Sequence, residues 1–333
     1  MTAIVGSSRD AAQSAEKTGK QAPQGPRSVP GANLDPIFKA ALYASGLLVL
    51  LLLGSIIILL FRGGLPALLE FGASFFWSTT WNPVTEKFSA GVMIYGTLFT
   101  GFLALVIALP MSFGIAFFLT EIAPVRLRRP VGMAIQLLAA VPSIIFGMWG
   151  FFVVVPLLAA YVQPPLIAAF SSIPFIGAVF KGPASGMGML TAGMILSFMI
   201  IPFITAMFVE IIEAVPTMLK ESAYGVGATT FEVFRHVSVP YGRTALVGAV
   251  MLGLGRALGE TMAVTYVIGN ATRISASLFA PGATIASTIA NEFPEAPIGS
   301  LKNHSLLELG FALFVISFIV LTISRALVRG KAT

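Results

Sequence analysis

Residues 245–268 read ALVGAVMLGLGRALGETMAVTYVI, an apolar run that holds one arginine, Arg256, and one glutamate, Glu260. A run of this length can cross a bilayer as a single helix, which needs about 20 apolar residues. Both charges then lie near the middle of the membrane, and a spacing of four residues puts them on one face of the predicted helix. A charge at that depth costs about 3 kcal/mol on insertion scales. The run therefore predicts a membrane-spanning helix whose arginine serves an ion or substrate pathway, and its positive charge favours an anion.

The composition of the whole chain places it in the membrane. The 333 residues are 56% hydrophobic and 10% charged, whereas soluble domains carry about 25% charged residues. The sequence has no cysteine, which excludes disulfides and thiolate metal sites. Its two histidines, His236 and His304, are too far apart in the sequence to form a metal or catalytic cluster. We predict an all-α integral membrane protein with no cofactor, no metal and no catalytic residues.

Six apolar runs set the predicted topology. The first follows a polar segment, residues 1–38, which we expect to be a disordered tail because it cannot bury enough apolar surface to fold. The transmembrane domain then covers residues 39–333. Proline at positions 110, 142 and 156 predicts kinks in the second and third spans. The predicted spans are residues 40–61, 91–119, 131–161, 187–209, 245–268 and 306–327.

The distribution of basic residues predicts the orientation. With the N-terminus on the cytoplasmic side, 14 of the 20 Lys and Arg residues fall in the tail and the inner loops, and five fall outside. Basic residues are enriched on the cytoplasmic side of membrane proteins. We therefore expect six spans with both termini in the cytoplasm.

The loop of about residues 210–242 is the most polar segment after the tail, and it carries a spaced motif. Two short helices are expected, interrupted by glycine, with Thr229 and Glu232 forming a capping box at the start of the second. We expect Pro240 to end the unit. The motif reads Glu221-Ser222-Ala223, three residues, Gly227, nine residues, Val237, one residue, Val239-Pro240.

This motif resembles the EAA loop of permease subunits in bacterial ABC importers. The spacing matches throughout, and the departures from the family pattern are Ser222, Val237 and Val239. The resemblance implies that the loop docks on an ATP-hydrolysing subunit and transmits its closure. Any helical hairpin between two spans is the plainer alternative.

Further segments narrow the resemblance to the C-type permeases of phosphate-specific (Pst) ABC importers. These segments are residues 142–150 (PSIIFGMWG), 219–225 (LKESAYG), 251–264 (MLGLGRALGETMAV) and 268–270 (IGN). The resemblance implies a MetI-like permease fold in the bacterial inner membrane that moves inorganic phosphate by alternating access. It also implies a related A-type permease as partner, two ATP-binding subunits and an extracytoplasmic phosphate-binding protein.

The candidate pathway residues have alternative roles. Arg256 offers a planar fork suited to phosphate oxygens. Glu260 could orient Arg256, accept a hydrogen bond from a phosphate hydroxyl, or form a buried ion pair that serves only structure. Thr261 could offer a hydroxyl, although bonding within the helix is the alternative. Ser143, after Pro142, could face a cavity or mark only a kink.

Three rival functions remain at this point. The first is an ABC permease for another oxyanion, such as sulfate or molybdate. The second is an ATP-independent anion channel or carrier. The third, an intramembrane enzyme, would need paired acids or a histidine cluster in the spans, and we expect only Arg256 and Glu260 to be ionisable at depth.

Overall fold

The computed structural model describes residues 35–174 and 176–329. These fall into two units that divide between Ile56 and Ile57. In the first unit, the described residues form the beginning of α2 (Asp35–Phe71), a long helix whose apolar side chains are exposed up to that division. The tail predicted for residues 1–38 lies outside the described residues up to position 34.

The described residues contain six helical stretches that are long and apolar enough to cross a membrane, which confirms the predicted number. They are Asp35–Phe76, Gly91–Ile122, Ser143–Phe170, Met189–Glu213, Thr230–Leu258 and Leu301–Ile323. The helices that make up the second unit beyond α2 are α3 (Gly91–Phe117), α4 (Val125–Ala139), α5 (Ser143–Trp149), α6 (Val155–Leu157), α7 (Gln163–Phe170), α8 (Ile176–Phe180), α9 (Met189–Glu213), α10 (Thr217–Gly225), α11 (Thr230–Val233), α12 (Val239–Leu258), α13 (Met262–Val267), α14 (Ile285–Glu292) and α15 (Leu301–Arg329).

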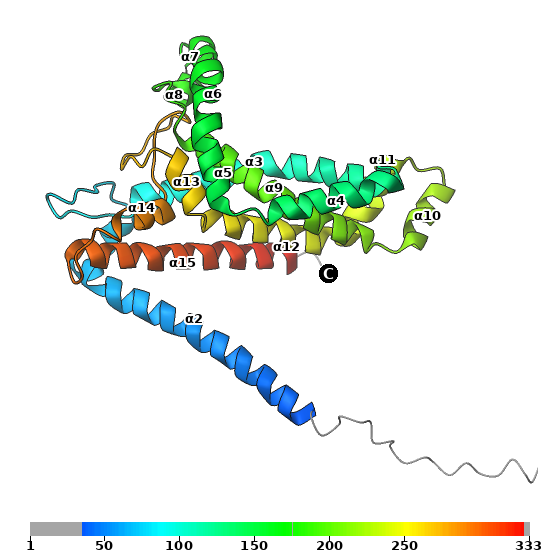
Figure 1. Cartoon of the computed structure of the whole chain (residues 1–333), viewed down its shortest axis with the longest axis horizontal. Helices are drawn as coiled ribbons and strands as arrows, with labels where there is room; N and C mark the ends of the chain where they lie inside the picture. Colours follow the sequence, from blue (N-terminus) through cyan, green and yellow to red (C-terminus); the bar gives the residue numbers. More distant parts are fainter. Residues whose placement is uncertain (1–34, 175, 330–333) are drawn as a thin grey trace, which may run out of the picture. The chain divides into compact units, whose positions relative to one another are not determined.

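Helix α9 is the centre of the second unit. It packs along α3, α4 and α12, and α12 packs in turn against α15 (Figure 1). The main hydrophobic core forms around α9, with Ile195, Ile200, Ile204 and Phe208 fully buried or nearly so. Small residues let the helices approach closely, as where Gly193 faces Leu103 of α3. This core holds α12, which carries Arg256, in a defined position.

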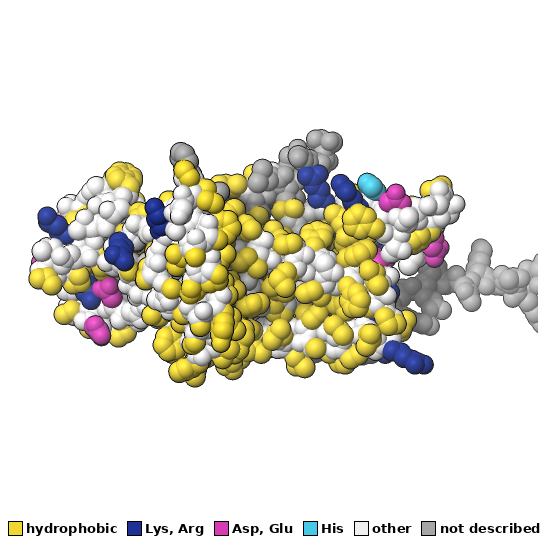
Figure 2. All heavy atoms as spheres, turned by 90° about the horizontal axis from the view of Figure 1, so that it is seen from above, with side chains coloured by type: hydrophobic (Ala, Val, Ile, Leu, Met, Phe, Trp, Pro, Cys, Tyr) yellow, Lys and Arg dark blue, Asp and Glu magenta, His cyan; other side chains and the backbone are white. Residues whose placement is uncertain are grey.

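The surface of the molecule matches a membrane environment. Figure 2 shows a broad hydrophobic region between two ends at which the charged side chains gather. A lipid-facing surface must be apolar because hydrocarbon cannot solvate charges. Hydropathy and structure therefore agree on a multi-pass membrane protein.

The third predicted span, residues 131–161, is wrong as a continuous helix. Helix α4 ends at Ala139, and α5 begins at Ser143 after an extended Pro142 (ψ 136°). Proline disfavours the helical conformation of the residue before it and lacks a backbone donor. The membrane-length stretch is therefore Ser143–Phe170, in which Pro156 is accommodated between two π turns, Gly150–Val154 and Leu158–Val162.

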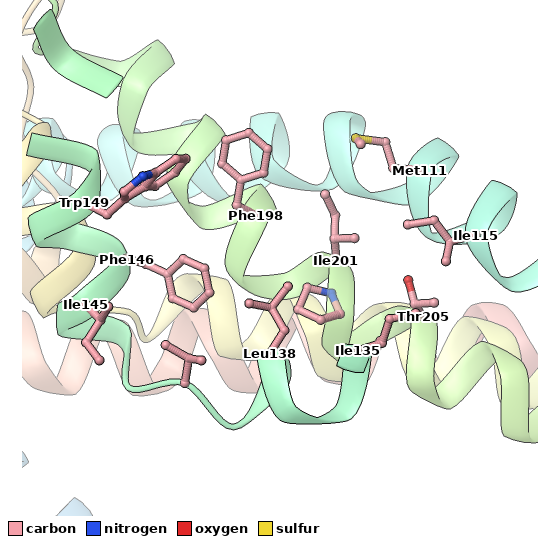
Figure 3. Close-up of a pocket in the computed structure, with 12 residues that line it drawn as sticks. Met111, Ile115, Ile135, Leu138, Ile145, Phe146, Trp149, Phe198, Ile201 and Thr205 are labelled. Atoms are coloured by element: carbon pink, nitrogen blue, oxygen red, sulfur yellow. The ribbon is translucent and has the colours of Figure 1, made fainter. Parts of the chain in front are cut away.

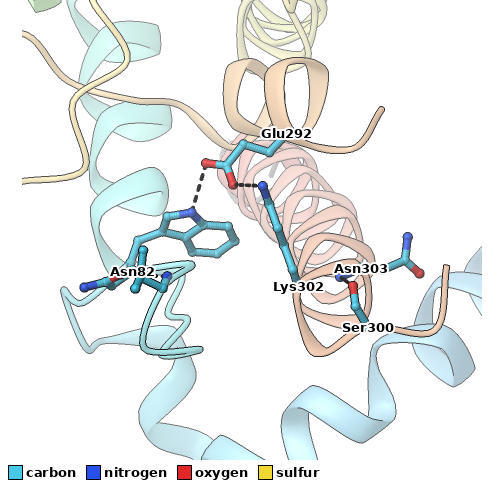
Figure 4. Close-up of polar contacts among 7 residues, drawn as sticks. Asn82, Glu292, Ser300, Lys302 and Asn303 are labelled. Atoms are coloured by element: carbon cyan, nitrogen blue, oxygen red, sulfur yellow. Dashed lines mark hydrogen bonds and ion pairs between the residues drawn. The ribbon is translucent and has the colours of Figure 1, made fainter. Parts of the chain in front are cut away.

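A second hydrophobic cluster lies at the end of the unit opposite the α10–α11 hairpin. It contains Phe75, Trp81 and Phe88, and the rings of Trp81 and Phe88 pack edge to face, so the aromatic segment before α3 is partly buried. The indole Nε1 of Trp81 donates to Glu292 at 2.9 Å, and Glu292 also pairs with Lys302 at 2.9 Å (Figure 4). These contacts join the segment before α3 to α14 and α15.

Candidate functional site

Arg256 lies in the last turn of α12, and its side chain is exposed on the surface of this chain. Helix α12 is pressed against α9, where a Cβ on Gly253 would come within 2.7 Å of Ile204. The Arg256 guanidinium carbon is 5.7 Å from the centre of the Phe203 ring on α9. A cation over an aromatic face is attracted by the ring. Phe203 therefore supports the guanidinium on this face of the bundle and leaves its hydrogen-bond donors available.

The prediction that Arg256 and Glu260 share one continuous helix is wrong. Helix α12 ends at Leu258, Gly259 caps it, and α13 begins only at Met262. Glu260 lies in the break between them. Its Oε1 accepts a hydrogen bond from the backbone N–H of Ala263 at 3.2 Å. This bond satisfies one of the N–H groups that the first turn of α13 leaves without a helical partner, which stabilises a new helix start at the break.

Arg256 and Glu260 do not form an ion pair in the described part of the chain, where the two salt bridges are Lys220–Glu121 and Lys302–Glu292. The geometry thus separates the roles of the two residues. Arg256 is exposed and supported by an aromatic ring, whereas Glu260 is half-buried and bound to the backbone. Arg256 has the properties required to bind an anion, and Glu260 shapes the segment beside it.

The other two candidate pathway residues lie next to helix breaks. Thr261 is in the α12–α13 break, and its hydroxyl donates to the carbonyl of Gly259 at 3.3 Å. Ser143 begins α5, one turn before Gly147, and a Cβ on Gly147 would be 2.8 Å from the Cα of Ala263 in α13. The structure therefore packs the element that carries Ser143 against the segment that follows Glu260 and Thr261.

The loop of residues 210–242 forms the expected pair of short helices, α10 and α11. The Thr229–Glu232 capping box is confirmed, with Thr229 N–H donating to Glu232 at 2.8 Å and Glu232 N–H to Thr229 Oγ1 at 3.4 Å. Between the helices, Gly227 has a φ of 91° and donates its N–H to the Tyr224 carbonyl at 2.9 Å. The turn thus depends on a residue that tolerates positive φ.

The hairpin presents an apolar surface to solvent. Met218 is 75% exposed and Val226 is 86% exposed, while Glu221 and Ser222 are also on the surface. An exposed apolar patch on a polar element is typical of a protein-binding surface. Gly227 and Val237 line a small hollow of about 370 Å³ beside it, together with Ala223, Val226, Ala228, Glu232 and His236.

The hairpin is firmly attached to the transmembrane helices. Lys220 of α10 pairs with Glu121 at the end of the second span at 2.8 Å. Phe231 and Phe234 pack on Phe117 of α3, with ring centres 5.9 and 4.6 Å away. A displacement of the hairpin must therefore move the ends of α3 and α12 with it.

Pro240 does not end the hairpin, contrary to the sequence prediction. Helix α11 continues through a π turn, Phe234–Ser238, directly into α12, where Pro240 occupies the first turn together with Val239. The altered hydrogen bonding of a π turn and a first-turn position both accommodate the missing N–H of proline. One helical stretch, Thr230–Leu258, consequently connects the hairpin to Arg256.

The structure also contains a buried ionisable residue that the sequence prediction missed. Glu308 in α15 is fully buried, and its carboxylate oxygens have no hydrogen-bond partner among the described residues. It lies against α2, where a Cβ on Gly64 would come within 2.8 Å of the Glu308 Cα. One turn earlier, His304 Nδ1 is 2.6 Å from the Gly63 carbonyl. Glu308 is only two residues inside the apolar run predicted for residues 306–327. A charged residue so close to the end of a run gives no hydropathy signal that it is buried.

The close approach of α2 and α15 makes Gly64 intolerant of side chains. We expect Gly64→Val to lower the stability of the purified protein by about 1–3 kcal/mol, because the added methyl groups overlap Glu308 in a packed interface. Thermal unfolding in detergent, followed by circular dichroism, measures this effect. Gly114→Val is the matched control, since nothing lies within 4 Å of a Cβ at Gly114. Equal unfolding temperatures for the two variants would contradict the prediction.

These features together define a class of protein. A bundle of membrane-length helices carries an exposed arginine on a broken helix, and a solvent-facing hairpin is joined to that helix. This is the arrangement expected of a multi-pass membrane transport subunit.

Comparisons identify the class. Residues 112–332 match the family described as binding-protein-dependent transport system inner membrane component. A chain of the MetNI methionine ABC transporter superposes with a TM-score of 0.52 at 19% identity, over 73% of this chain and 94% of that chain. A chain of a bacterial ABC transporter involved in alginate import superposes with a TM-score of 0.54 at 15% identity, over 89% and 99% of the two chains. These two likenesses show a MetI-like fold, and the family match places the chain among inner-membrane transport components.

The sequence comparison is more specific. The phosphate transport system permease protein PstC of Mesorhizobium japonicum is 56% identical over 291 residues, which cover 87% of this chain and 89% of that protein. The chain therefore belongs to the binding-protein-dependent transport inner-membrane components and, within them, to the PstC permease family.

Proposed function

We propose that this chain forms part of the transmembrane pathway of an ATP-driven importer of inorganic phosphate. One observation carries the assignment of the pathway: Arg256 is exposed on a membrane-spanning helix. A guanidinium facing hydrocarbon would be costly, so charged residues in such segments face a water-filled cavity or another subunit. The exposed side of α12 is therefore the side on which a second permease completes the route.

Arg256 is the group proposed to bind the substrate in transit. Its guanidinium stays charged at all physiological pH values and can donate two parallel hydrogen bonds to one phosphate. The Phe203 ring supports one side of it without competing for those donors. An anion that has lost part of its water thus meets a fixed positive charge inside the membrane.

Glu260, Thr261 and Ser143 are proposed to line the same route. The hydrogen bond from Ala263 to Glu260 favours a role in shaping the α12–α13 break, and non-helical backbone at membrane depth is tolerated where it lines a cavity. A carboxylate at this point also disfavours a fully ionised anion. A phosphate hydroxyl, by contrast, could donate to it.

The α10–α11 hairpin is proposed to dock on an ATP-binding subunit. The docking element is residues Glu221, Ser222, Ala223 and Gly227, and Val237, Val239 and Pro240 lead into α12. Continuity from Thr230 to Leu258 supports transmission of a movement from the hairpin to Arg256. ATP hydrolysis then takes place in two partner subunits, and a phosphate-binding protein delivers substrate to the other side of the membrane.

The proposed location is the bacterial inner membrane, with both termini in the cytoplasm. The hairpin, the ion pair Lys220–Glu121 and the basic start of α4 lie at one end of the bundle. An excess of Arg and Lys at that end supports its assignment to the cytoplasmic side. In this scheme, residues 1–38 form a tail separate from the permease domain of residues 39–333.

Uptake of radiolabelled phosphate by the reconstituted transporter tests this function. The complete complex with its binding protein should accumulate phosphate only with ATP, and an excess of sulfate should leave the rate unchanged. Inhibition by sulfate would instead indicate a broader oxyanion permease. Uptake by the isolated chain without ATP would indicate a channel or carrier.

A further inference from the structure

A deep apolar pocket of about 580 Å³ lies between α3, α4, α5 and α9. Its walls are formed by large apolar side chains, among them Met111, Ile115, Ile135, Leu138, Phe198 and Trp149 (Figure 3). The pocket is elongated along α9. Ile115, Ile135 and Thr205 lie at one end, and Phe146 and Trp149 lie at the other (Figure 3). The first end is nearer the α10–α11 hairpin, because Phe231 of α11 packs on Phe117, two residues after Ile115.

This pocket is separate from the proposed phosphate route. Its lining residues on α9 are Phe198, Ile201, Pro202 and Thr205. With 3.6 residues per turn, Phe203 projects about 150° around α9 from the middle of that set. Arg256 lies over Phe203, so the pocket and the arginine are on opposite sides of α9. The pocket is therefore not part of the proposed anion route.

The end of the pocket nearer the hairpin contains an unpartnered hydroxyl. Thr205 is fully buried, and its Oγ1 has no hydrogen-bond partner among the described residues. Three other buried threonines, Thr97, Thr100 and Thr120, bond back to the carbonyl four residues earlier, at 2.7–2.9 Å. For Thr205 that carbonyl belongs to Ile201, which already accepts from Ser112 at 3.3 Å. An acceptor supplied by a ligand would complete the hydrogen bonding of Thr205.

A basic residue lies beyond the same end. Arg128 precedes Ile135 by seven residues, which puts both on one face of α4 and about 10 Å apart along the helix axis. Its Nε donates to the Ala123 carbonyl at 2.9 Å, so the guanidinium is held in place while its two terminal nitrogens stay available for an anion. The acidic residue nearby, Glu121, is paired with Lys220 and does not compete.

We propose that this pocket binds an anionic phospholipid. The phosphate pairs with Arg128, an ester carbonyl accepts from Thr205, and an acyl chain lies along Ile135, Leu138 and Phe198 toward Trp149. Along the membrane normal, the basic residue, the hydroxyl and the apolar wall follow one another in the same order as the phosphate, the ester and the acyl chain of a phospholipid. Basic residues beside clefts between membrane helices commonly bind anionic head groups. A helix of a neighbouring permease is the alternative occupant, and crosslinking distinguishes it from a lipid.

Photocrosslinking of the assembled transporter tests this proposal. Phosphatidylglycerol with a diazirine on its acyl chain is added to the complex in nanodiscs, and labelled peptides are mapped by mass spectrometry. We expect labelling of residues 135–149 and 198–205, which unlabelled phosphatidylglycerol suppresses and which phosphatidylcholine and inorganic phosphate do not. Arg128→Gln should reduce this labelling about tenfold, the effect of losing a charge-assisted bond to phosphate.

Arg129→Gln is the matched control, because it removes the same charge from a different face of α4. Leu138→Trp fills the pocket and should also remove the label, and Thr205→Val provides a nearly isosteric second variant if the tryptophan disturbs folding. Equal labelling in all variants, or equal competition by the two lipids, would mean non-specific boundary lipid and overturn the proposal. Crosslinking of a Leu138→Cys variant to a neighbouring permease, with no lipid label, would overturn it as well.

Discussion

Arg256→Gln is expected to reduce ATP-driven phosphate uptake at least 100-fold while the complex still assembles. Glutamine keeps much of the side-chain volume but removes the charge and the bidentate donors. Hydrogen bonds to charged groups contribute about 1.5–3 kcal/mol each, and about 1.4 kcal/mol corresponds to a factor of ten in rate or affinity. Losing two of them is therefore enough for the predicted effect. Uptake of labelled phosphate into proteoliposomes measures it.

Assembly should survive this substitution because Arg256 has no carboxylate partner among the described residues whose charge would be left unpaired; Glu260 bonds to the backbone of Ala263 instead. Arg243→Gln is the matched control, since Arg243 is exposed at the hairpin end of the same helix. Its uptake should stay near that of the unmodified complex. Near-normal uptake by Arg256→Gln would show that transport does not require the arginine, and failure of that variant to assemble would show that the arginine serves structure.

Hydropathy predicted the membrane-length stretches well but placed helix breaks poorly. Runs of apolar residues report burial in lipid or protein, and that signal covers a whole span. The end of a helix depends on a few local hydrogen bonds. The sequence predicted a kink at Pro142, and in the structure the helix is interrupted completely at this residue. The break at residues 259–261 had a weaker signal, a glycine followed by a glutamate three residues before Ala263.

Local motifs were more informative for the hairpin than for the pathway. The Thr229–Glu232 capping box depends only on neighbours in the sequence, and it formed as predicted. The support of Arg256 by Phe203 joins two helices that are distant in the sequence. Nothing in either segment alone indicates that contact. Glu308 was missed for the same reason, because its burial depends on Gly64 of another helix.

The continuity of α11, the π turn and α12 changes how coupling should be understood. A loop that ended at Pro240 would pass force to the membrane through a flexible joint. In the structure the same segment is one helical stretch, anchored by Phe231 and Phe234 on α3. In the proposed coupling, a movement of a hairpin held in this way is expected to displace the helix that carries Arg256. The geometry of the turn between α10 and α11 should then determine whether the hairpin can dock on the ATP-binding subunit.

Gly227→Val is accordingly expected to impair docking of the hairpin and so to lower transport and stimulated ATP hydrolysis together. Gly227 adopts a φ of 91°, and a β-branched residue held there costs about 1–3 kcal/mol in backbone strain. The turn should open and displace Glu221 and Val226 from the docking surface. We expect phosphate uptake to fall about tenfold or more. The ATPase activity that the phosphate-loaded binding protein stimulates should fall by the same factor.

Gly225→Val is the matched control, because Gly225 ends α10 without positive φ and has nothing within 4 Å of a Cβ. A valine there adds the same bulk to the same hairpin, so equal losses in both variants would attribute the effect to surface bulk and contradict a requirement for the turn conformation.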